Sequence, residues 1–520
     1  MRMIKVKSSL KYGGYYLDKV CHPNNTVKRA LTSLLRLKMP VKIIVKRIDA
    51  VDRLKIPTYL CHLCKQKNFL EGTWLNKNAY GKGRDSIHVK ASLEGTWLNK
   101  NAYGKGRDSI YAKASALMEC IERSSCFYFL KNLKSFKEID YEHLNVEKIS
   151  ISKMLKAIPK IYGYCKNDKF LLSILKKTPF TWRRVYSLSE KRSFFFPHEW
   201  FMATSTGYAA GNTLEEAILQ GLCEVIERYT ITKLTMTKQD IPSIDIRTIN
   251  DSVARRLISK FYLAGIKLFI KDFTMGLGIP TVCVLAHDPK GPKSVRIFCA
   301  AGTSLNRDVA LIRALTEVAQ HRAAHLASDS KKYPGQTGEF PLYVNLKEAG
   351  ALARHEKCIP FSKLPTHCNK DFKEEIDFTL RKLKKIGAEG VVTDVTHPIL
   401  RMPVVIVNII GMITRSDMQH PYLKISNQFA EIGDHKEALK ILERFFELYP
   451  TKKNEKDIVL AIGLLYIKLK RFDKAKKMFR RLISLSQVDN KGILKCKQFE
   501  ERKFLLDAYK GLRKCGVKWI

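Results

Sequence analysis

Short apolar runs and long amphipathic stretches alternate over most of the chain. Runs rich in β-branched residues at 280–286, 390–395 and 402–410 predict buried strands. Residues 213–234 instead carry apolar positions at helical spacing, which predicts one long helix. Because strand-like and helix-like segments are interleaved, we expect residues 1–411 to form an α/β or α+β domain.

After Met412 only helical periods remain. Residues 422–450 and 459–486 each have the pattern of a helix–turn–helix pair. Residues 418–520 are therefore predicted to be an all-α, tetratricopeptide-like domain, a kind that usually presents a groove to a peptide or protein. A plain helical hairpin packed on the main domain is the alternative. The residues at repeat spacing are Gly433, Ala438, Leu442 and Pro450, echoed one repeat later by Ala475 and Phe479.

One segment is written twice in tandem, at 70–92 and at 93–115. The copies differ only at His88 against Tyr111 and at Val89 against Ala112. Only the second copy runs directly into an acidic helix, so the first is expected to be a duplicated insertion. Because surface loops tolerate long insertions at small entropic cost, we predict that residues 70–92 form an exposed, poorly packed excursion.

Two helical stretches, 115–123 and 220–228, carry the same acidic pattern. Each places two glutamates three residues apart on one helix face, and an arginine follows directly. The other sides of both helices are apolar, which predicts that the helices are buried. Buried carboxylates are costly unless they are paired or bind a metal. The residues are Glu119, Glu122, Glu224 and Glu227, followed by Arg123 and Arg228.

A third stretch, 313–322, is similar and carries Glu317, Gln320 and Arg322. Converging carboxylates need cations between them, and hard oxygen ligands select Mg²⁺, which commonly bridges carboxylates to nucleotide phosphates. Arginines at such a site would bind the phosphates through bidentate contacts. The glycine-containing loop at 204–217 enters the second acidic helix as an anion site would, although a turn with a helix cap explains it equally. The residues indicate a Mg²⁺–nucleotide site without a GxxxxGK[ST] loop.

Basic residues dominate the charge, with 93 Lys and Arg against 50 Asp and Glu and a net charge of +43. They are spread along the chain, so a generally basic surface is favoured over nucleic-acid binding. No apolar run reaches the roughly 18 residues of a membrane span, and the N-terminus has no apolar signal core. The thirteen cysteines are scattered, several within apolar runs, as expected of reduced thiols in a cytoplasmic protein. Cys61 and Cys64 have zinc-ligand spacing, but no second CxxC accompanies them, and no zinc is expected.

Together these motifs resemble the YcaO family. Its three stretches occur here in order: GKG followed by A-SAL-E-x-x-ER within 104–123, S-x-G-x-AAGN-x-x-EEA…E-x-x-ER at 205–228, and AL-RAL-E-x-x-Q-x-R at 310–322. A later TDVT with PVV…G at 393–411 fits the end of that domain. The resemblance covers roughly residues 1–411. It implies an α/β fold with internal pseudo-symmetry, with ATP and Mg²⁺ as cofactors.

The resemblance also implies roles for individual residues. The four glutamates of the acidic helices match metal-binding positions. Near the N-terminus the family has a basic residue seven positions before a threonine or serine, and Lys19 stands there although arginine is usual. Thr206 replaces the usual asparagine of the second motif. The positions that match nucleotide contacts are Lys19, Thr26, Ser115, Asn212, Glu216, Arg228 and Arg322.

What the family does sets the expected function. Its members activate a peptide-backbone amide: the amide oxygen attacks the γ-phosphate of ATP, a nucleophile adds to the carbonyl carbon, and phosphate leaves. Repeats in place of a proline-rich tail look like the archaeal members that install thioglycine in methyl-coenzyme M reductase, often with a TfuA-like protein. We therefore expect a peptide or protein substrate, a TfuA-like partner and a thioamide product, and leave a homodimer open. Azoline formation by cyclodehydration is the alternative within this class, and a basic nucleic-acid-binding protein or a repeat scaffold is the alternative outside it.

Overall fold

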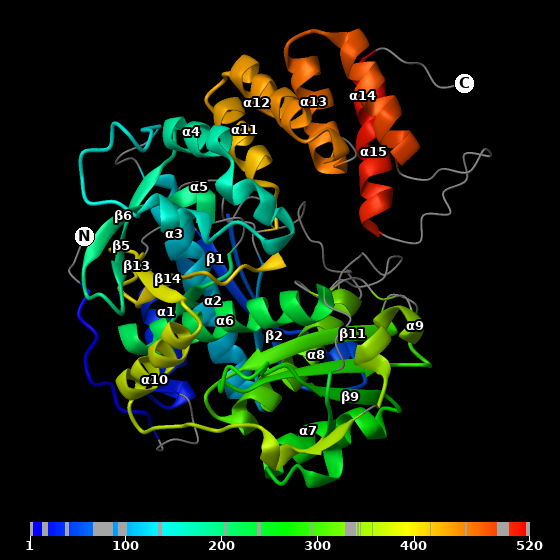
Figure 1. The fold of residues 1–520 in the computed structure, drawn as a ribbon. Coiled ribbons are helices and arrows are strands. Elements are labelled where there is room, and N and C mark those ends of the chain that lie inside the picture. Colours follow the sequence, from blue (N-terminus) through cyan, green and yellow to red (C-terminus); the bar gives the residue numbers. More distant parts are fainter. Residues whose placement is uncertain are drawn as a thin grey trace. The chain divides into compact units, whose positions relative to one another are not determined.

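The fold comes from a computed structural model of the whole chain (Figure 1). It describes residues 4–12, 19–36, 41–65, 87–91, 101–133, 138–201, 205–236, 241–292, 295–327, 340, 343, 345–355, 357–415, 418–452, 455–485 and 499–515. The chain forms two compact units. Unit 1 holds Met1–Leu133, Arg184–Ser193 and Thr204–Arg415, and unit 2 holds Lys134–Arg183, Phe194–Ala203 and Ser416–Ile520.

The first sheet of unit 1 has the strand order β3-β1-β2-β4. Its strands are β1 (Val41–Arg47), β2 (Thr58–Lys65), β3 (Ile87–Ala91) and β4 (Asn101–Lys105), and all of its neighbours are antiparallel. Two helices accompany it, α1 (Pro23–Leu35) and α2 (Ser109–Lys131). Helix α2 starts at Ser109 because the Asp108 carboxylate accepts hydrogen bonds from the Ile110 and Tyr111 amides, which satisfies the free N–H groups of the first turn.

The duplicated segment takes two different structures in its two copies. Residues 87–91 of the first copy form β3, which pairs with β1 at the edge of the sheet. The matching residues of the second copy, 110–114, lie in the first turns of α2. The excursion predicted for residues 70–92 lies otherwise outside the described residues, and its described part is a paired strand, not a loose loop.

The second sheet of unit 1 has the order β11-β10-β9-β8-β12. Helices α7 (Ser252–Leu263) and α8 (Arg307–Ala327) pack on one face of it through a core that includes Val284 and Phe298. A second core, which includes Leu285 and Cys299, covers the other face together with the segment around α9 (Leu346–Ala349). The strands are β8 (Ser243–Asp245), β9 (Lys267–Asp272), β10 (Thr281–His287), β11 (Ile297–Thr303) and β12 (Cys358–Pro360).

The third sheet runs β7, β14, β13, β5 in sheet order, and β5 continues through a hairpin into β6. Its strands are β5 (Trp182–Ser187), β6 (Ser193–Pro197), β7 (Tyr208–Ala210), β13 (Glu389–Asp394) and β14 (Val404–Ile410). Helices α6 (Leu214–Met236) and α10 (Phe372–Lys385) pack against it through a core that includes Leu222, Val407 and Ile376. The strands predicted at 280–286, 390–395 and 402–410 are β10, β13 and β14, so the expected mixed α/β architecture is confirmed.

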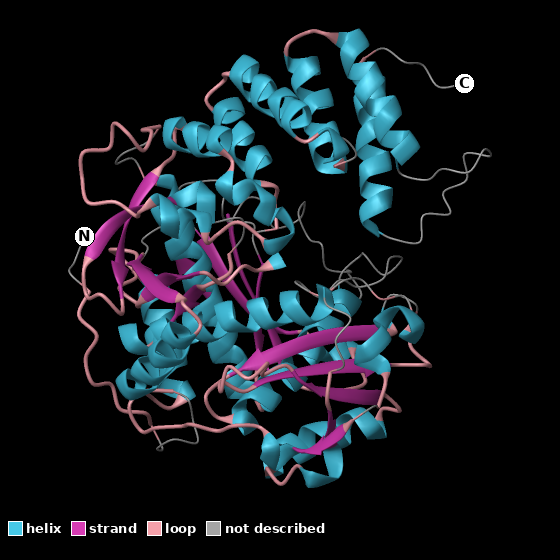
Figure 2. Cartoon of the chain, viewed as in Figure 1, coloured by secondary structure: helices cyan, strands magenta, loops and turns pink. Residues whose placement is uncertain are grey.

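Unit 2 is mainly helical (Figure 2). The C-terminal part holds α11 (Pro421–Glu431), α12 (His435–Leu448), α13 (Lys456–Lys468), α14 (Phe472–Leu485) and α15 (Phe499–Lys514). Ala438, Ala475 and Phe479 are fully buried, as repeat spacing predicts, and Gly433 takes the positive φ of 90° at the turn between α11 and α12. None of the described helices combines the length and hydropathy that a bilayer crossing needs.

The repeats share unit 2 with an earlier stretch of the chain, a grouping that the predicted boundary at 411–418 did not include. That stretch carries α3 (Ile151–Leu155), α4 (Lys169–Lys177) and α5 (His198–Phe201). The Asp168 carboxylate caps α4 and also accepts hydrogen bonds from the hydroxyls of Tyr422 and Tyr449. Lys424, within α11, donates to the Trp200 carbonyl at 3.2 Å. The helical repeats are therefore continuous in packing with those parts of residues 138–201 that belong to unit 2.

His420 gives unit 2 a predictable acid sensitivity. Its ring is buried among Tyr162, Tyr422 and Phe445, and burial, with some help from Lys452, lowers its pKa to about 3. The folded pKa lies below the ordinary value, so the destabilisation begins as pH falls below 6.5 and grows until pH reaches about 3. At pH 5 this protonation costs about 2 kcal/mol.

We therefore expect His420→Asn to flatten the pH dependence of thermal unfolding between pH 7 and 5. Asparagine keeps an acceptor for the Tyr422 amide, which His420 now caps through Nδ1 at 3.3 Å. His143, exposed beside Asp140, is the matched control, and His143→Asn should leave the slope of unit 2 unchanged. An unaltered slope in His420→Asn would contradict the assignment.

Candidate functional site

One cavity of about 1060 Å³ lies within unit 1. Three helices contribute one face each: α2, α6 and α8. Strands β4 and β7 and the start of α1 complete its wall. Nearly all of the predicted site residues line it: Lys19, Thr26, Ser115, Glu119, Glu122, Asn212, Glu216, Glu224, Glu227 and Arg228.

On α2, the two predicted metal-binding glutamates lie one turn apart. The Glu119 carboxylate accepts from the Tyr103 amide at 3.1 Å and pairs with the Arg123 guanidinium at 2.5 Å. Burial raises the pKa of Glu119 in spite of Arg123. Burial raises the pKa of Glu122 further, and the neighbouring carboxylates of Glu224 and Glu119 add to the increase. A cation beside Glu122 would relieve the same desolvation and repulsion that raise its pKa.

Helix α6 repeats this arrangement. The Arg228 guanidinium lies 3.1 Å from Glu227 and 3.7 Å from Glu224. Burial raises the pKa of Glu224 to about 7 although Arg228 opposes the change, and Glu227 shifts in the same direction for the same reason. Four carboxylates with raised pKa values in one cavity match a site whose charge is completed by a cation.

The donor set fits Mg²⁺ in chemistry, since it consists of carboxylate oxygens. Among the residues that the structure describes, however, no three acidic, histidine or cysteine side chains lie close enough to hold a metal as they stand. Glu119 and Glu224 face Arg123 and Arg228 instead. A cation bound in the cavity would therefore compete with Arg123 and Arg228 for these two carboxylates.

The predicted nucleotide contacts form a second cluster in the same cavity. The Glu216 carboxylate accepts from Lys19 Nζ at 3.1 Å and from the Asn212 side-chain amide at 3.2 Å. The Thr26 hydroxyl donates to Asn212 Oδ1, also at 3.2 Å. Ser115 lines the cavity one turn before Glu119. These groups come from residues 19–26, from α2 and from the start of α6, so three distant parts of the sequence meet here.

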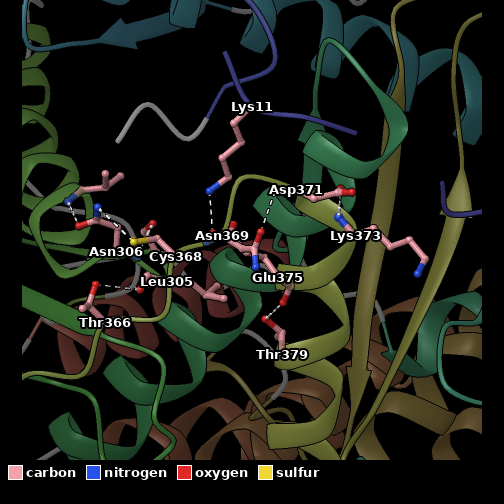
Figure 3. A network of polar contacts seen from close by, with 12 residues as sticks. Lys11, Leu305, Asn306, Thr366, Cys368, Asn369, Asp371, Lys373, Glu375 and Thr379 are labelled. Carbon is pink, nitrogen blue, oxygen red and sulfur yellow. Dashed lines mark hydrogen bonds and ion pairs between the residues drawn. The ribbon is translucent and has the colours of Figure 1, made fainter. Parts of the chain in front are cut away.

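The N-terminal segment, residues 4–12, carries the chain toward Lys19 and is fixed to two helix starts. The Lys7 amide donates to Glu215 at 2.8 Å, and the Ser9 amide donates to Asp371 at the start of α10 at 2.8 Å. Lys11 reaches Glu375 at 2.7 Å, and both side chains are almost fully buried (Figure 3). The Tyr12 amide then donates to the Lys19 carbonyl at 2.7 Å. The Lys11–Glu375 pair thus anchors the segment that delivers Lys19.

We expect Lys11→Met to destabilise the protein by about 3–5 kcal/mol, because the buried Glu375 carboxylate loses its ammonium partner. The double variant Lys11→Met/Glu375→Leu should recover most of the loss, since an apolar pair carries no desolvation cost. Thermal unfolding measures both. The control is Lys373→Met, which removes the exposed pair with Asp377 from the same helix and should cost under about 1 kcal/mol. Equal losses in Lys11→Met and the control would contradict this anchoring role.

Arg322 is the one predicted site residue that the structure places elsewhere, and its nucleotide role is corrected. Its side chain is fully buried and does not line the cavity. The guanidinium pairs with Asp52 at 3.2 Å and with Asp288 at 3.1 Å, and it donates to the Val295 carbonyl at 2.7 Å. The guanidinium makes four hydrogen bonds inside the core, on the side of α8 that faces away from the cavity.

Glu317, which the sequence places on the third acidic stretch, lines the cavity, as do Lys105 and Arg313, for which the sequence predicted no role. Glu317 on α8 pairs with Lys105 on β4 and lies 3.9 Å from Arg228 on α6. Burial opposes ionisation, but Lys105, His321 and Arg228 together outweigh it and lower the pKa of Glu317, so it is an anion at neutral pH. Arg313, one turn earlier on α8, lines the cavity and donates to the Thr303 carbonyl at 2.8 Å. Arg313 lies four residues before Glu317, and this helical spacing could have predicted that both residues share one face of α8.

The family model of the YcaO cyclodehydratases, described as binding ATP and Mg²⁺, matches residues 103–413. The chain belongs to the YcaO family, and ATP and Mg²⁺ are the cofactors of that family. Two tetratricopeptide-repeat models match residues 422–452 and 457–489, so the predicted C-terminal repeats are confirmed.

Curated relatives include a protein of Methanothermobacter thermautotrophicus, 31% identical over 39% of this chain and 55% of its own length. A protein of Rhizobium leguminosarum bv. trifolii from the tfuA 3′ region is 30% identical over 45% of this chain and 56% of its own. The chain thus spans about half the length of these relatives.

Two solved structures share the fold. A heterocyclase in complex with substrate and cofactor aligns with a TM-score of 0.60 and 23% identity, covering 79% of this chain and 55% of the other. YcaO from Methanopyrus kandleri, bound with AMPPCP and Mg²⁺, aligns with a TM-score of 0.51 and 18% identity, covering 78% and 96%. The expected YcaO-type α/β fold is confirmed.

Proposed function

We propose that the protein is an enzyme that uses ATP and Mg²⁺ to activate a peptide-backbone amide by O-phosphorylation. The observation that carries the proposal is that four glutamates of α2 and α6 line one cavity together with Lys19, Lys105, Arg228 and Arg313. Carboxylates with raised pKa values suit Mg²⁺, and the cations suit phosphate oxygens. The membership of the chain in an ATP- and Mg²⁺-binding family supports the same assignment.

The residues would divide the work by charge. Glu119, Glu122, Glu224 and Glu227 would hold Mg²⁺, and Arg228 lies close enough to them to share a bound phosphate. Lys19, Thr26, Ser115, Asn212 and Glu216 would position the nucleotide. ATP, when bound, supplies the phosphoryl group that turns the amide oxygen into a leaving group. Catalysis then rests on positioning and on charge neutralisation, the usual logic of phosphoryl transfer, and requires no nucleophilic side chain.

For the product, we propose a thioamide, such as thioglycine in a protein of the methyl-coenzyme M reductase kind. Relatives from a methanogen and from a tfuA region support this choice, and a TfuA-like partner follows from the second. The repeats are proposed to contact the protein substrate or partner, and a homodimer remains open. The eleven cysteines whose side chains the structure describes are all free, which supports a reducing, cytoplasmic setting. Azoline formation is the second candidate, supported by the cyclodehydratase description of the family.

The test is ATP turnover with candidate peptides, with and without sulfide, followed by mass spectrometry of the peptide. Replacement of an oxygen by sulfur would support thioamide formation, and loss of one water would support cyclodehydration instead. Peptide-independent ATP turnover, or none under any condition, would overturn the proposal. Salt-sensitive binding to nucleic acid with an intact phenotype in Glu224→Ala would favour a basic nucleic-acid-binding protein.

A further inference from the structure

Helix α8 repeats the geometry of α2 in detail. Each helix follows a strand, β4 or β11, whose penultimate residue is a glycine packed against the helix backbone. A Cβ on Gly104 would lie 2.1 Å from the Ala112 carbonyl oxygen and the Ala116 amide nitrogen. A Cβ on Gly302 would meet the corresponding atoms of Ala310 and Ala314, at 2.2 and 2.7 Å. The two strand–helix pairs are therefore in the same register, and their residues can be compared position by position.

In this register the pair of a glutamate and a basic residue four positions later recurs on α8, but the basic residue is different. Glu119 has Arg123 four residues later, and Glu224 on α6 likewise has Arg228. Glu317 on α8 has His321 in that place, with Nε2 3.8 Å from the carboxylate. Of the three side chains at this position, only histidine can take up and release a proton, because arginine stays protonated in proteins.

His321 faces the cavity in a basic environment. On its own helix it contacts Glu317, and Lys105 of β4 and Arg228 of α6 act on it electrostatically. Its neighbour Gln320 is engaged with the Tyr103 carbonyl at 3.4 Å, and no hydrogen-bond partner for His321 Nδ1 occurs among the described residues. Burial lowers the pKa of His321 to about 4, against the opposite pull of Glu317 and with the help of Lys105 and Arg228. The imidazole is thus neutral at pH 7 and able to accept a proton.

We propose that His321 is the proton-transfer group of the reaction, which accepts the proton of the attacking nucleophile and delivers it to the departing phosphate. The inference rests on the proposed function and adds a residue to it. The other two positions of the pattern hold permanent cations, which can neutralise phosphate charge but cannot take up a proton. The cavity therefore combines two fixed charges with one exchangeable site.

The step balances with hydrosulfide as the nucleophile. Sulfur forms a bond to the carbonyl carbon of the O-phosphorylated amide, and the S–H proton passes to His321. The carbon–oxygen bond then breaks, the electron pair leaves with phosphate, and the imidazolium returns its proton to that phosphate. The peptide keeps sulfur in place of oxygen, ADP and hydrogen phosphate are released, and no oxidant or reductant is needed. With a side-chain thiol or hydroxyl as nucleophile, the same imidazole would accept that proton.

The experiment compares three variants of the full chain with the wild type: His321→Gln, His321→Arg and His321→Ala. We expect kcat for peptide-dependent ADP release to fall by about 10²- to 10⁴-fold in all three. KM for ATP and nucleotide affinity, measured directly on the same samples, should change less than about threefold because imidazole is not assigned to phosphate binding. Added imidazole should restore part of the rate of His321→Ala, in proportion to the free base. His287→Gln, at a strand position outside the cavity, is the control and should behave as wild type.

The outcomes separate the two proposals. A kcat within threefold of wild type in His321→Gln would overturn the role of His321 while leaving amide activation intact. Activity retained in His321→Arg alone would show that positive charge, not proton transfer, is required, and would also overturn it. A wild type without peptide-dependent turnover would instead remove the proposed function itself. Loss of nucleotide affinity together with rate, without rescue by imidazole, would assign His321 a merely structural role and reject the inference.

Discussion

Glu122→Gln should abolish peptide-dependent ATP turnover and leave a protein at least as stable as the wild type. The carboxylate lies half-buried near Glu119 and Glu224, and its pKa is raised well above the ordinary range, so without a cation it destabilises the fold increasingly as pH rises. Glutamine keeps the shape and removes that repulsion, but it cannot contribute a charged ligand to Mg²⁺. We expect a loss of at least about 100-fold in kcat, as for removal of one electrostatic stabiliser.

ADP release and thermal unfolding at pH 8 without Mg²⁺ measure the two effects. The control is Glu142→Gln, which changes an exposed carboxylate of unit 2 and should affect neither quantity. If Glu122→Gln lost stability and kept its turnover, the carboxylate would be structural and the metal assignment would fail.

Two arginines of one helix should respond in opposite ways. Arg322→Met leaves the buried Asp52 without this guanidinium and leaves Asp288 with Arg53 alone, and we expect a loss of about 3–5 kcal/mol or failure to fold at growth temperature. Arg322→Lys keeps the charge but not the fork that spans both carboxylates, so it should be destabilised and yet retain the KM for ATP.

Arg313→Met, by contrast, should keep the stability within about 1 kcal/mol and raise the KM for ATP by at least about tenfold, since it removes a cation from the cavity wall. Unfolding by urea and initial-rate kinetics on Arg313→Met and Arg322→Lys make the comparison. An increased KM in Arg322→Lys with unchanged stability would reinstate the nucleotide role that the structure withdraws.

The sequence predicted the acidic helices because their pattern is local. Glutamates three residues apart on an apolar helix are visible without any knowledge of partners, and Glu119, Glu122, Glu224 and Glu227 all line the cavity. Lys105 was missed because its partner, Glu317, lies 212 residues away, a pairing that no local pattern encodes. The sheet orders could not be predicted for the same reason.

The prediction that Arg322 contacts the nucleotide was wrong, although its spacing from Glu317 in the sequence already argues against it. Arg322 follows Glu317 by five residues, and five residues turn an α-helix by about 500°, which leaves the two side chains about 140° apart. Arg313 and His321 lie four residues before and after Glu317, so they share its face. A motif match alone does not predict on which side of a helix a residue lies, whereas the helical period does.

The duplicated segment shows that local sequence alone does not determine secondary structure here. Nearly identical residues form β3 at 87–91 and helix α2 at 110–114. In the second copy, the Asp108 cap and the helical periods that follow it act together. In the first, pairing with β1 satisfies the backbone instead. Here tertiary surroundings, together with the exchange of Ala112 for the β-branched Val89, decide the structure.

The composition of unit 2 has a consequence for synthesis on the ribosome. The hydrogen bond between Asp168 and Tyr422 can form only after another 254 residues have been synthesised. At typical elongation rates of 5–20 residues per second, that interval lasts on the order of ten to fifty seconds. Over this time the nascent segment at 138–201, with Trp200 and Phe170 among its apolar side chains, has no repeats to cover it. Folding of this protein in the cell should therefore depend on chaperones that hold nascent chains, and release of the chain at residue 411 should yield an aggregating product and not a smaller enzyme.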